Sequence, residues 1–277
     1  MKILGFSQLH NELSKGNLRN WMKCMQSVCD YIYIYDNASD DGSIEYYSMF
    51  DNVRVVASPI NRHAVEGSDR FGKKILLDKC LNEHPDVDWI FWMDGDTMLD
   101  NRLLNKKTLT NLLSKSEDKG VDGVLLGHYN LWRSDIYYRV DDQYNWLNEV
   151  GVLALWKNNG TLSFHDSGGL HQKQSPDGIN CIDWMTKPQD SSEPSEAVVP
   201  SLIHRGFATD DQIINKYFFY KKMGQTGWNL GRLILENGLT LETLPEVVIP
   251  SWFEVKDNKN PQEKQRINQN ELLRRNL

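Results

Sequence analysis

Residues 89–93 have the sequence WIFWM and are followed at once by Asp94, Gly95 and Asp96. Five consecutive apolar residues rich in aromatic side chains predict a strand that is buried on both faces, as in the centre of a parallel sheet. In extended chain residues i and i+2 point the same way, so the two carboxylates can face one site, and Gly95 allows close approach to the backbone. Paired oxygen ligands suit Mg²⁺ or Mn²⁺. A turn whose aspartates bond their own backbone is the alternative.

Around this stretch, the first half of the chain repeats one alternation of strands and helices. Apolar runs predict strands, and apolar residues at helical spacing predict two helices; the strands are at residues 3–6, 31–35, 53–57 and 121–127, and the helices at 18–28 and 69–81. This alternation predicts an α/β fold with a mostly parallel sheet flanked by helices. Such sheets bind ligands at the carboxyl ends of their strands. The strand at 31–35 also ends in an acidic cluster, so we expect a site at this edge of the sheet.

The second half is less regular. Residues 152–156 predict another strand, whereas residues 165–200 are rich in Gly, Pro, Ser and Asp and predict a long loop. Thr209 and Gln212 form a capping-box pattern that predicts a helix through about residue 223. A further helix is predicted at 228–236. We expect a single domain over residues 1–250, with a nucleotide-sugar-binding half at 1–127, an acceptor and catalytic half at 128–250, and a tail at 251–277.

Composition narrows the class of protein. The net charge of −7 and the pI of about 5.5 argue against a general nucleic-acid binder, which would carry a basic surface. The four cysteines form no CxxC pair, so neither a zinc site nor a disulfide scaffold is indicated, and reduced thiols in a cytoplasmic protein are expected. No apolar window is long enough to predict a signal-peptide core or a transmembrane segment.

Three segments together resemble a known family. An apolar strand ending in an Asp-x-Asp motif and preceded by YDNASDDGS at residues 35–43 is similar to a GT-A glycosyltransferase of family 2. Leu9-His10-Asn11-Glu12 resembles the first-strand motif of that family, although an Arg often stands where this chain has His10. The resemblance covers residues 1 to about 100 and resumes at 200–224. It implies a metal-dependent hexosyltransferase that moves a sugar from a nucleoside-diphosphate sugar to an acceptor hydroxyl with inversion.

The resemblance also implies roles for residues of the donor half. Asp36, with Asn37, would contact the nucleoside base, and Asp94 and Asp96 would hold the metal ion and the donor diphosphate. Arg70 and Lys73 lie in a segment that passes near the donor, where a cation could pair with phosphate; a solvated helix face is an equal alternative. For Asp40, Asp41 and Gly42 we prefer turn and helix-start chemistry.

In the acceptor half, the resemblance implies a histidine as a further metal ligand. His204 follows a short apolar run and precedes Gly206, and we prefer it over His171, with His10, His128 and His165 ranking lower. A lone histidine is more often structural, which is the alternative.

Asp210 and Asp211 lie in the first turn of the predicted helix, at the place where the family has its catalytic base. We prefer Asp211 as the base, with Asp166 and Glu149 next, whereas helix-dipole chemistry would favour acids in this turn regardless of function. Acceptor contacts are expected from aromatic and charged residues: Trp132, Arg133, Arg139, Asp141, Asp142 and Trp146. A mixture of core and surface residues is an equal interpretation of that set.

Two other functions remain open at the level of sequence. A sugar-phosphate nucleotidyltransferase would use a similar sheet, but it usually has an N-terminal glycine-rich phosphate loop, and Leu4-Gly5-Phe6-Ser7 holds only one glycine. A non-catalytic nucleotide-sugar-binding module could retain the fold, but loss of the Asp-x-Asp motif would then be expected, and both aspartates are present.

Overall fold

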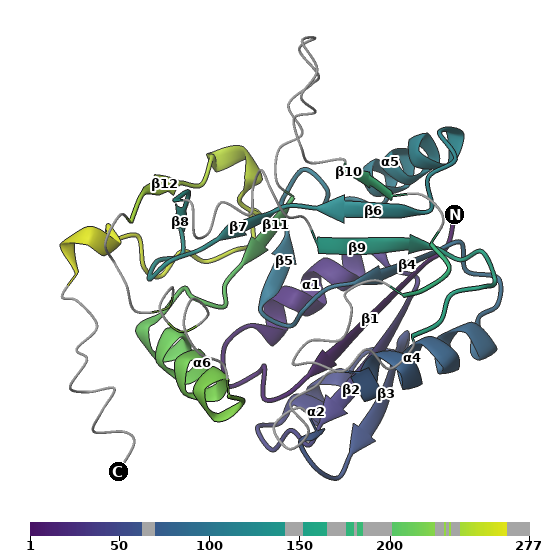
Figure 1. Ribbon diagram of the computed structural model, residues 1–277, viewed down its shortest axis with the longest axis horizontal. Helices are drawn as coiled ribbons and strands as arrows, with labels where there is room; N and C mark the ends of the chain where they lie inside the picture. The colour runs from purple at the N-terminus through teal and green to yellow at the C-terminus, as the bar shows by residue number, and fades with distance from the viewer. Residues whose placement is uncertain are drawn as a thin grey trace.

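The computed structural model describes residues 1–62, 70–141, 152–164, 176–179, 182–184, 201–224, 230, 233 and 239–264, with only the backbone of residues 70, 71, 152, 153 and 182–184. Strands and helices alternate through the first half of the chain, as predicted (Figure 1). The elements are β1 Ile3–Leu9, α1 Leu18–Val28, β2 Tyr31–Asn37, α2 Ser43–Tyr47, β3 Val53–Ser58, α4 Arg70–Glu83, β4 Trp89–Trp92, β5 Thr97–Leu99, α5 Lys106–Asp118, β6 Gly123–Leu126, β7 His128–Asn130, β8 Tyr137–Arg139, β9 Val152–Lys157, β10 Ile182–Trp184, β11 Leu202–His204, α6 Asp210–Lys222, β12 Leu241–Thr243, and the short 3-10 helices η1 Glu246–Val248 and η2 Pro261–Glu263.

A seven-stranded sheet in the order β10-β6-β9-β4-β1-β2-β3 forms the centre of the fold. Strands β3, β2, β1 and β4 are parallel, and β10 is parallel to β6, whereas β9 runs antiparallel to both of its neighbours. This arrangement confirms the predicted α/β class with a mostly parallel sheet. In Figure 1 the carboxyl ends of β1, β4 and β6 all point toward the smaller strands and α6.

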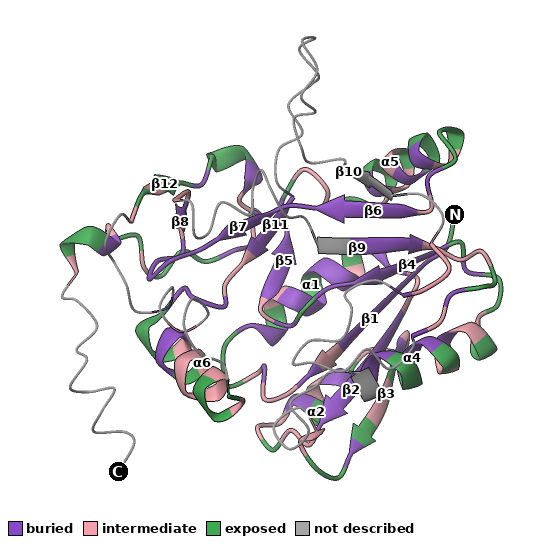
Figure 2. Cartoon of the chain, viewed as in Figure 1, coloured by how far each residue is buried: buried purple, intermediate pink, exposed green. Residues whose placement is uncertain are grey.

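The alternation of side chains along the strands builds two hydrophobic layers, one on each face of the sheet. Most of the central strands are accordingly buried (Figure 2). Ile32 and Ile34 of β2 pack on the side of α1 and α5, whereas Tyr33 and Tyr35 pack on the side of α4. Phe6 of β1 meets Trp92 of β4 edge to face, with ring centroids 4.9 Å apart. Because both faces are covered, the central strands are apolar throughout, and this is why the sequence shows them as continuous runs.

Two smaller sheets extend from the carboxyl edge of the large one. Strand β11 lies between β5, to which it is antiparallel, and β7, to which it is parallel; β12 pairs with β8. Helix α6 begins at the predicted capping box, in which Thr209 accepts from the backbone N–H of Gln212 and Gln212 accepts from that of Thr209. Trp132, Phe207, Ile213 and Leu233 form a third hydrophobic cluster beneath this helix.

The prediction of a continuous loop over residues 165–200 is wrong in one part, because β10 lies within it and pairs with the edge strand β6. A three-residue edge strand carries too little periodic pattern to stand out from its polar surroundings. The remainder of that segment, and most of the helix predicted at 228–236, lie outside the described residues. Between residues 251 and 264 the chain contacts the body of the protein: Asp135 accepts from the backbone N–H groups of Lys256 and Asp257 at 3.0 Å each.

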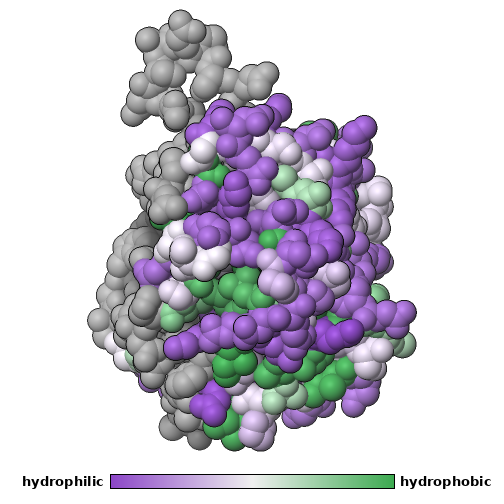
Figure 3. All heavy atoms as spheres, turned by 90° about the vertical axis from the view of Figure 1, so that its right-hand side faces the viewer, coloured by the Kyte–Doolittle hydropathy of each residue, from purple (hydrophilic) through white to green (hydrophobic). Residues whose placement is uncertain are grey.

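The right-hand side of Figure 1 carries the amino ends of the parallel strands. Hydrophilic side chains predominate on this face, and hydrophobic ones gather in patches in the lower part of the view (Figure 3). Within the described part of the chain, no helix combines the length and the apolar character needed to cross a membrane.

Candidate functional site

Strand pairing brings the Asp-x-Asp motif and His204 together at the carboxyl edge of the large sheet. Strand β5 begins directly after Asp96, and β11 pairs with it so that His204 lies opposite Thr97. The backbone N–H of Arg205 then donates to the carbonyl oxygen of Asp96 at 2.7 Å. Residues separated by more than one hundred positions in the sequence therefore share one corner of the fold.

A carboxylate oxygen of Asp96 and a ring nitrogen of His204 lie next to each other. Asp96 Oδ2 lies 3.4 Å from His204 Nε2. The other ring nitrogen, His204 Nδ1, lies 2.8 Å from Asn130 Oδ1 on β7. With the amide oxygen accepting, Nδ1 carries the proton and Nε2 keeps its lone pair, which is the arrangement of a metal-ligating histidine and its orienting partner.

A lysine ammonium lies against these two atoms. Lys216 Nζ of α6 is 3.1 Å from Asp96 Oδ2 and 3.4 Å from His204 Nε2. Burial by itself would raise the pKa of Asp96, but the positive charge of Lys216 outweighs it and holds that pKa well below its ordinary value. Asp96 is therefore a permanent anion at neutral pH, as a ligand for a hard cation must be.

Because residue 206 is glycine, there is room beside it for the side chains of Asp96, His204 and Lys216. A Cβ atom at this position would lie 2.1 Å from Lys216 Nζ, 2.5 Å from His204 Nε2 and 2.6 Å from Asp96 Oδ2. Since real Cβ atoms essentially never make contacts this short, any side chain at position 206 would displace part of the site.

His128 is the buried neighbour of this group. Its ring centroid lies 5.6 Å from that of His204. Burial, helped by the nearby His204, lowers the pKa of His128 to about 3, so its ring is neutral at physiological pH. His128 thus adds no charge to the corner where Asp96 and Lys216 meet.

Asp94 makes a different contact from Asp96. Its side chain is exposed, and its Oδ1 accepts from Trp92 Nε1 at 2.9 Å. Among the residues that the structure describes, no three His, Cys, Asp or Glu side chains are grouped closely enough to hold a metal ion. Of the predicted metal ligands, the structure brings Asp96 and His204 together. That they bind a metal ion, and that Asp94 takes part, stays a prediction.

Lys73 is buried against the face of Trp92. Only 2% of Lys73 is exposed, and its Nζ lies 4.4 Å from the centre of a Trp92 ring. The interpretation of Lys73 as part of a solvated helix face is therefore wrong, because α4 turns this side chain toward the sheet. The Trp92 indole contacts Lys73 through the face of its ring and Asp94 through its N–H. The Lys73 cation therefore lies beside the Asp-x-Asp motif.

Asp36 and Asn37 end β2 in a buried position at the same edge. Asp36 Oδ1 accepts from the backbone N–H of Ser39 at 2.8 Å, whereas Asp36 Oδ2 and Asn37 Oδ1 are buried with no hydrogen-bond partner in the described structure. Such orphaned polar atoms are rare and costly in native proteins. Ser7 Oγ and His10 Nδ1 of the first-strand segment share this condition. These atoms are the candidate contacts for a polar ligand.

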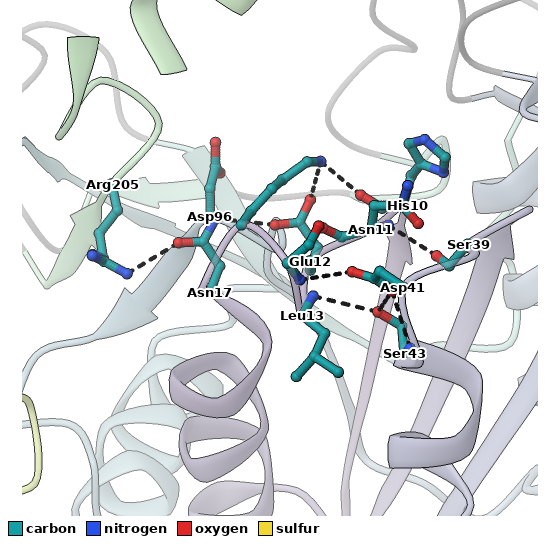
Figure 4. Close-up of polar contacts among 12 residues, drawn as sticks. His10, Asn11, Glu12, Leu13, Asn17, Ser39, Asp41, Ser43, Asp96 and Arg205 are labelled. Carbon is teal, nitrogen blue, oxygen red and sulfur yellow. Dashed lines mark hydrogen bonds and ion pairs between the residues drawn. The ribbon is translucent and has the colours of Figure 1, made fainter. Parts of the chain in front are cut away.

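The first-strand motif and the acidic turn after β2 form one hydrogen-bonded unit (Figure 4). Asn11 donates to Asp40 through its amide at 2.8 Å, and Asp41 accepts from the Ser43 hydroxyl at 2.6 Å. Asp41 therefore makes the turn and helix-start contacts preferred from the sequence, whereas the Asp40 side chain contacts Asn11 of the first-strand motif. Glu12 lies against Gly95, where a Cβ would approach its Cγ to 2.9 Å, so the close approach expected at Gly95 is made by the protein itself.

The two acids that open α6 have different surroundings. Asp210 forms a two-pronged ion pair with buried Arg133, with Nε 2.6 Å from Oδ1 and Nη2 3.1 Å from Oδ2. Asp211 is exposed. At about 100° per residue, Asp211 leaves α6 about 140° around the helix from Lys216, so these two side chains occupy different faces. Which of the two acids is a base stays a prediction.

The aromatic and charged residues proposed for the acceptor are mostly interior. Trp132 and Arg139 are fully buried, and the guanidinium of Arg139 stacks 4.4 Å from a ring centre of Trp132 while pairing with Asp141. With Arg133 committed to Asp210, burial favours the interpretation of this set as core. Several predicted residues lie outside the described residues: Asp142, Trp146, Glu149, His165, Asp166 and His171, together with the side chain of Arg70.

Comparison with known proteins gives one informative result. Residues 43–145 match the galactosyl transferase GMA12/MNN10 family. This match supports a glycosyltransferase. It covers less than half of the chain, including the Asp-x-Asp strand, and it does not confirm the narrower resemblance to family 2.

The remaining comparisons add little. No curated protein matches the sequence. Among solved structures, the chain is similar to 4-diphosphocytidyl-2C-methyl-D-erythritol synthase from Anaerococcus prevotii DSM 20548, with 12% identity, 57% of this chain and 70% of that chain covered, and a TM-score of 0.30. A similarity at this level carries no conclusion about fold or activity.

Proposed function

We propose that the protein is a metal-dependent glycosyltransferase of the GT-A type, which transfers a hexose from a nucleoside-diphosphate sugar to an acceptor hydroxyl. The observation that carries this proposal is the pairing of Asp96 Oδ2 with His204 Nε2, 3.4 Å apart at the carboxyl edge of the sheet. The match to the galactosyl transferase GMA12/MNN10 family supports the same class of reaction.

The residues present fit Mn²⁺ or Mg²⁺. Neighbouring ligands around an octahedral ion with bonds of about 2.1 Å are about 3 Å apart, close to the spacing of Asp96 Oδ2 and His204 Nε2. Asn130 fixes the ring of His204, and Gly206 keeps the space clear. Ions of this kind are commonly bound through one or two protein carboxylates plus substrate phosphates, so few protein ligands are needed.

The donor would extend from this corner along the strand ends. Its diphosphate would lie near Asp96 and His204, and Lys73 supplies a positive charge on the same side of the motif. Its nucleoside would reach the ends of β1 and β2, where Asp36 Oδ2 and Asn37 Oδ1 are buried and have no hydrogen-bond partner among the described residues. A base that donates hydrogen bonds to these oxygens would remove the penalty of leaving them unsatisfied.

The transfer itself needs stabilisation of the leaving group and activation of the acceptor. A bound divalent cation would offset the charge that grows on the departing nucleoside diphosphate. Asp96 and His204 would hold that cation, and because their positions are fixed they would need little reorganisation during the reaction. If transfer proceeds with inversion, we expect Asp211, or else Asp210, to accept the proton of the acceptor hydroxyl.

A thermal-shift screen of nucleotide sugars tests this function. Because a ligand that binds only the folded state raises its melting temperature, at least one nucleotide sugar should raise it in the presence of Mn²⁺ and not in chelator. Asp96→Asn should abolish the response, whereas Asp118→Asn, the same change at an exposed position at the end of α5, should keep it. A panel without any metal-dependent shift would overturn the proposed function.

A further inference from the structure

Lys216 has a position that the glycosyltransferase proposal does not explain. Its Nζ is 3.1 Å from Asp96 Oδ2 and 3.4 Å from His204 Nε2, within hydrogen-bonding distance of the same two atoms that would bind a metal ion. The ring of Phe207 supports the ammonium from another side, with its centre 4.4 Å from Nζ. The Lys216 ammonium therefore occupies a cation site, which is formed by an oxygen anion, an imidazole lone pair and an aromatic face.

A divalent cation and this ammonium cannot both use the site in the observed arrangement. The cation would bond to Asp96 Oδ2 and His204 Nε2, to which Lys216 Nζ already donates. Two positive charges within a few ångströms of each other also repel strongly away from bulk water.

We propose that Lys216 is an internal competitor of the divalent cation: its ammonium neutralises Asp96 when no metal is bound and must leave Asp96 and His204 before the metal can bind. This inference rests on the metal site of the proposed function and adds a determinant of its affinity. Lysine suits such a role because its charge sits at the end of a flexible four-carbon stem, so the ammonium can move away while α6 stays in place.

The competition sets the metal affinity of the free protein. Displacing the ammonium breaks its interactions with Asp96, His204 and the Phe207 ring, and this cost reduces the net free energy gained when a metal ion binds. Removing the charge should therefore tighten metal binding, although the change deletes a residue that contacts both ligands. A lysine that merely positioned the ligands would give the opposite result, because its loss would loosen them.

Direct measurement of Mn²⁺ binding, by the electron paramagnetic resonance signal of the free ion, tests the competition without any substrate. Lys216→Met keeps the length of the side chain and removes its charge, and Lys216→Gln serves as a second variant should the first fold poorly. Lys222→Met makes the same change of charge at an exposed position of the same helix. We expect Lys216→Met to bind Mn²⁺ at least tenfold more tightly than the wild type, and Lys222→Met to stay within about twofold.

Melting temperatures provide a second readout. In chelator Lys216→Met should melt below the wild type, because Asp96 has lost its counter-charge, and saturating Mn²⁺ should remove that difference. Unchanged or weaker Mn²⁺ binding by both Lys216 variants would overturn the competition. Asp96→Asn separates this failure from a failure of the metal site: if Asp96→Asn binds Mn²⁺ as well as the wild type does, the metal site itself is wrong.

Discussion

Replacing Gly206 with alanine would place a methyl group between the side chains that form the site. The new Cβ would lie 2.5 Å from His204 Nε2 and 2.6 Å from Asp96 Oδ2, whereas ordinary contacts begin at 3.4 Å. The Lys216 ammonium can move aside at the end of its stem, but His204 is fixed by Asn130 and Asp96 by its place at the start of β5. Each ligand atom would have to retreat by about 0.8–0.9 Å, several times the ~0.2 Å tolerance of a metal site.

We therefore expect Gly206→Ala to weaken Mn²⁺ binding at least tenfold, or about 1.4 kcal/mol, and to lower the free energy of unfolding by about 1–3 kcal/mol through overpacking. Gly5→Ala is the matched control, since its Cβ would meet Met25 Cε at 2.3 Å and Cys29 Sγ at 2.8 Å in the core beneath α1. It should cost similar stability while Mn²⁺ affinity, measured by paramagnetic resonance on folded protein, stays at the wild-type value. Wild-type Mn²⁺ affinity in Gly206→Ala would show that Asp96 and His204 do not bind the metal ion at this position.

Three further predictions concern the surroundings of the site. Burial lowers the pKa of His128 from 6.5 to about 3, so only the unfolded state gains this proton as the pH falls from 7 to 5. In urea titrations the free energy of unfolding of the wild type should therefore fall by about 2 kcal/mol between pH 7 and pH 5, whereas that of His128→Phe should not show this loss. Parallel pH profiles for the two proteins would contradict this. Thr209→Ala should cost about 1 kcal/mol in the same titration by removing the N-cap of α6, and a cost near zero would mean that the cap is unimportant. Asp211→Asn should reduce sugar transfer severely at unchanged donor affinity. Asp210→Asn should mainly reduce the free energy of unfolding, by about 1 kcal/mol, because it removes the half-exposed ion pair with Arg133. Wild-type transfer in Asp211→Asn would show that another residue is the base.

Local sequence patterns were sufficient to predict six of the seven strands of the large sheet, all except β10. Strands buried on both faces need apolar side chains at every position, so β2 and β4 appear as the continuous runs at 31–35 and 89–93. The start of α6 was equally visible, because the capping box is a property of four consecutive residues. The site was predictable where it followed such elements, which is the case for Asp96 after β4.

Contacts between segments that are distant in the sequence leave no local pattern from which they could be predicted. The pairing of β11 with β5 and β7 joins three-residue strands, too short for a periodic signal, and it is this pairing that brings Asn130 to His204. Lys216 could not be assigned either, since its neighbours depend on how α6 packs. Helix α5 was missed because only Leu109, Leu113 and Ser116 are buried along its thirteen residues, so its apolar stripe is narrow.

In the proposed function, Asp96 and His204 hold a divalent cation through which the donor diphosphate binds. Calorimetric titration of a nucleoside diphosphate, the one contained in the nucleotide sugar that the thermal-shift screen selects, tests this role of the cation. In Mn²⁺ we predict saturable binding, which chelator should weaken at least tenfold and which Asp96→Asn should weaken even with the metal present. Equal affinity with Mn²⁺ and with chelator in the wild-type protein would contradict the claim.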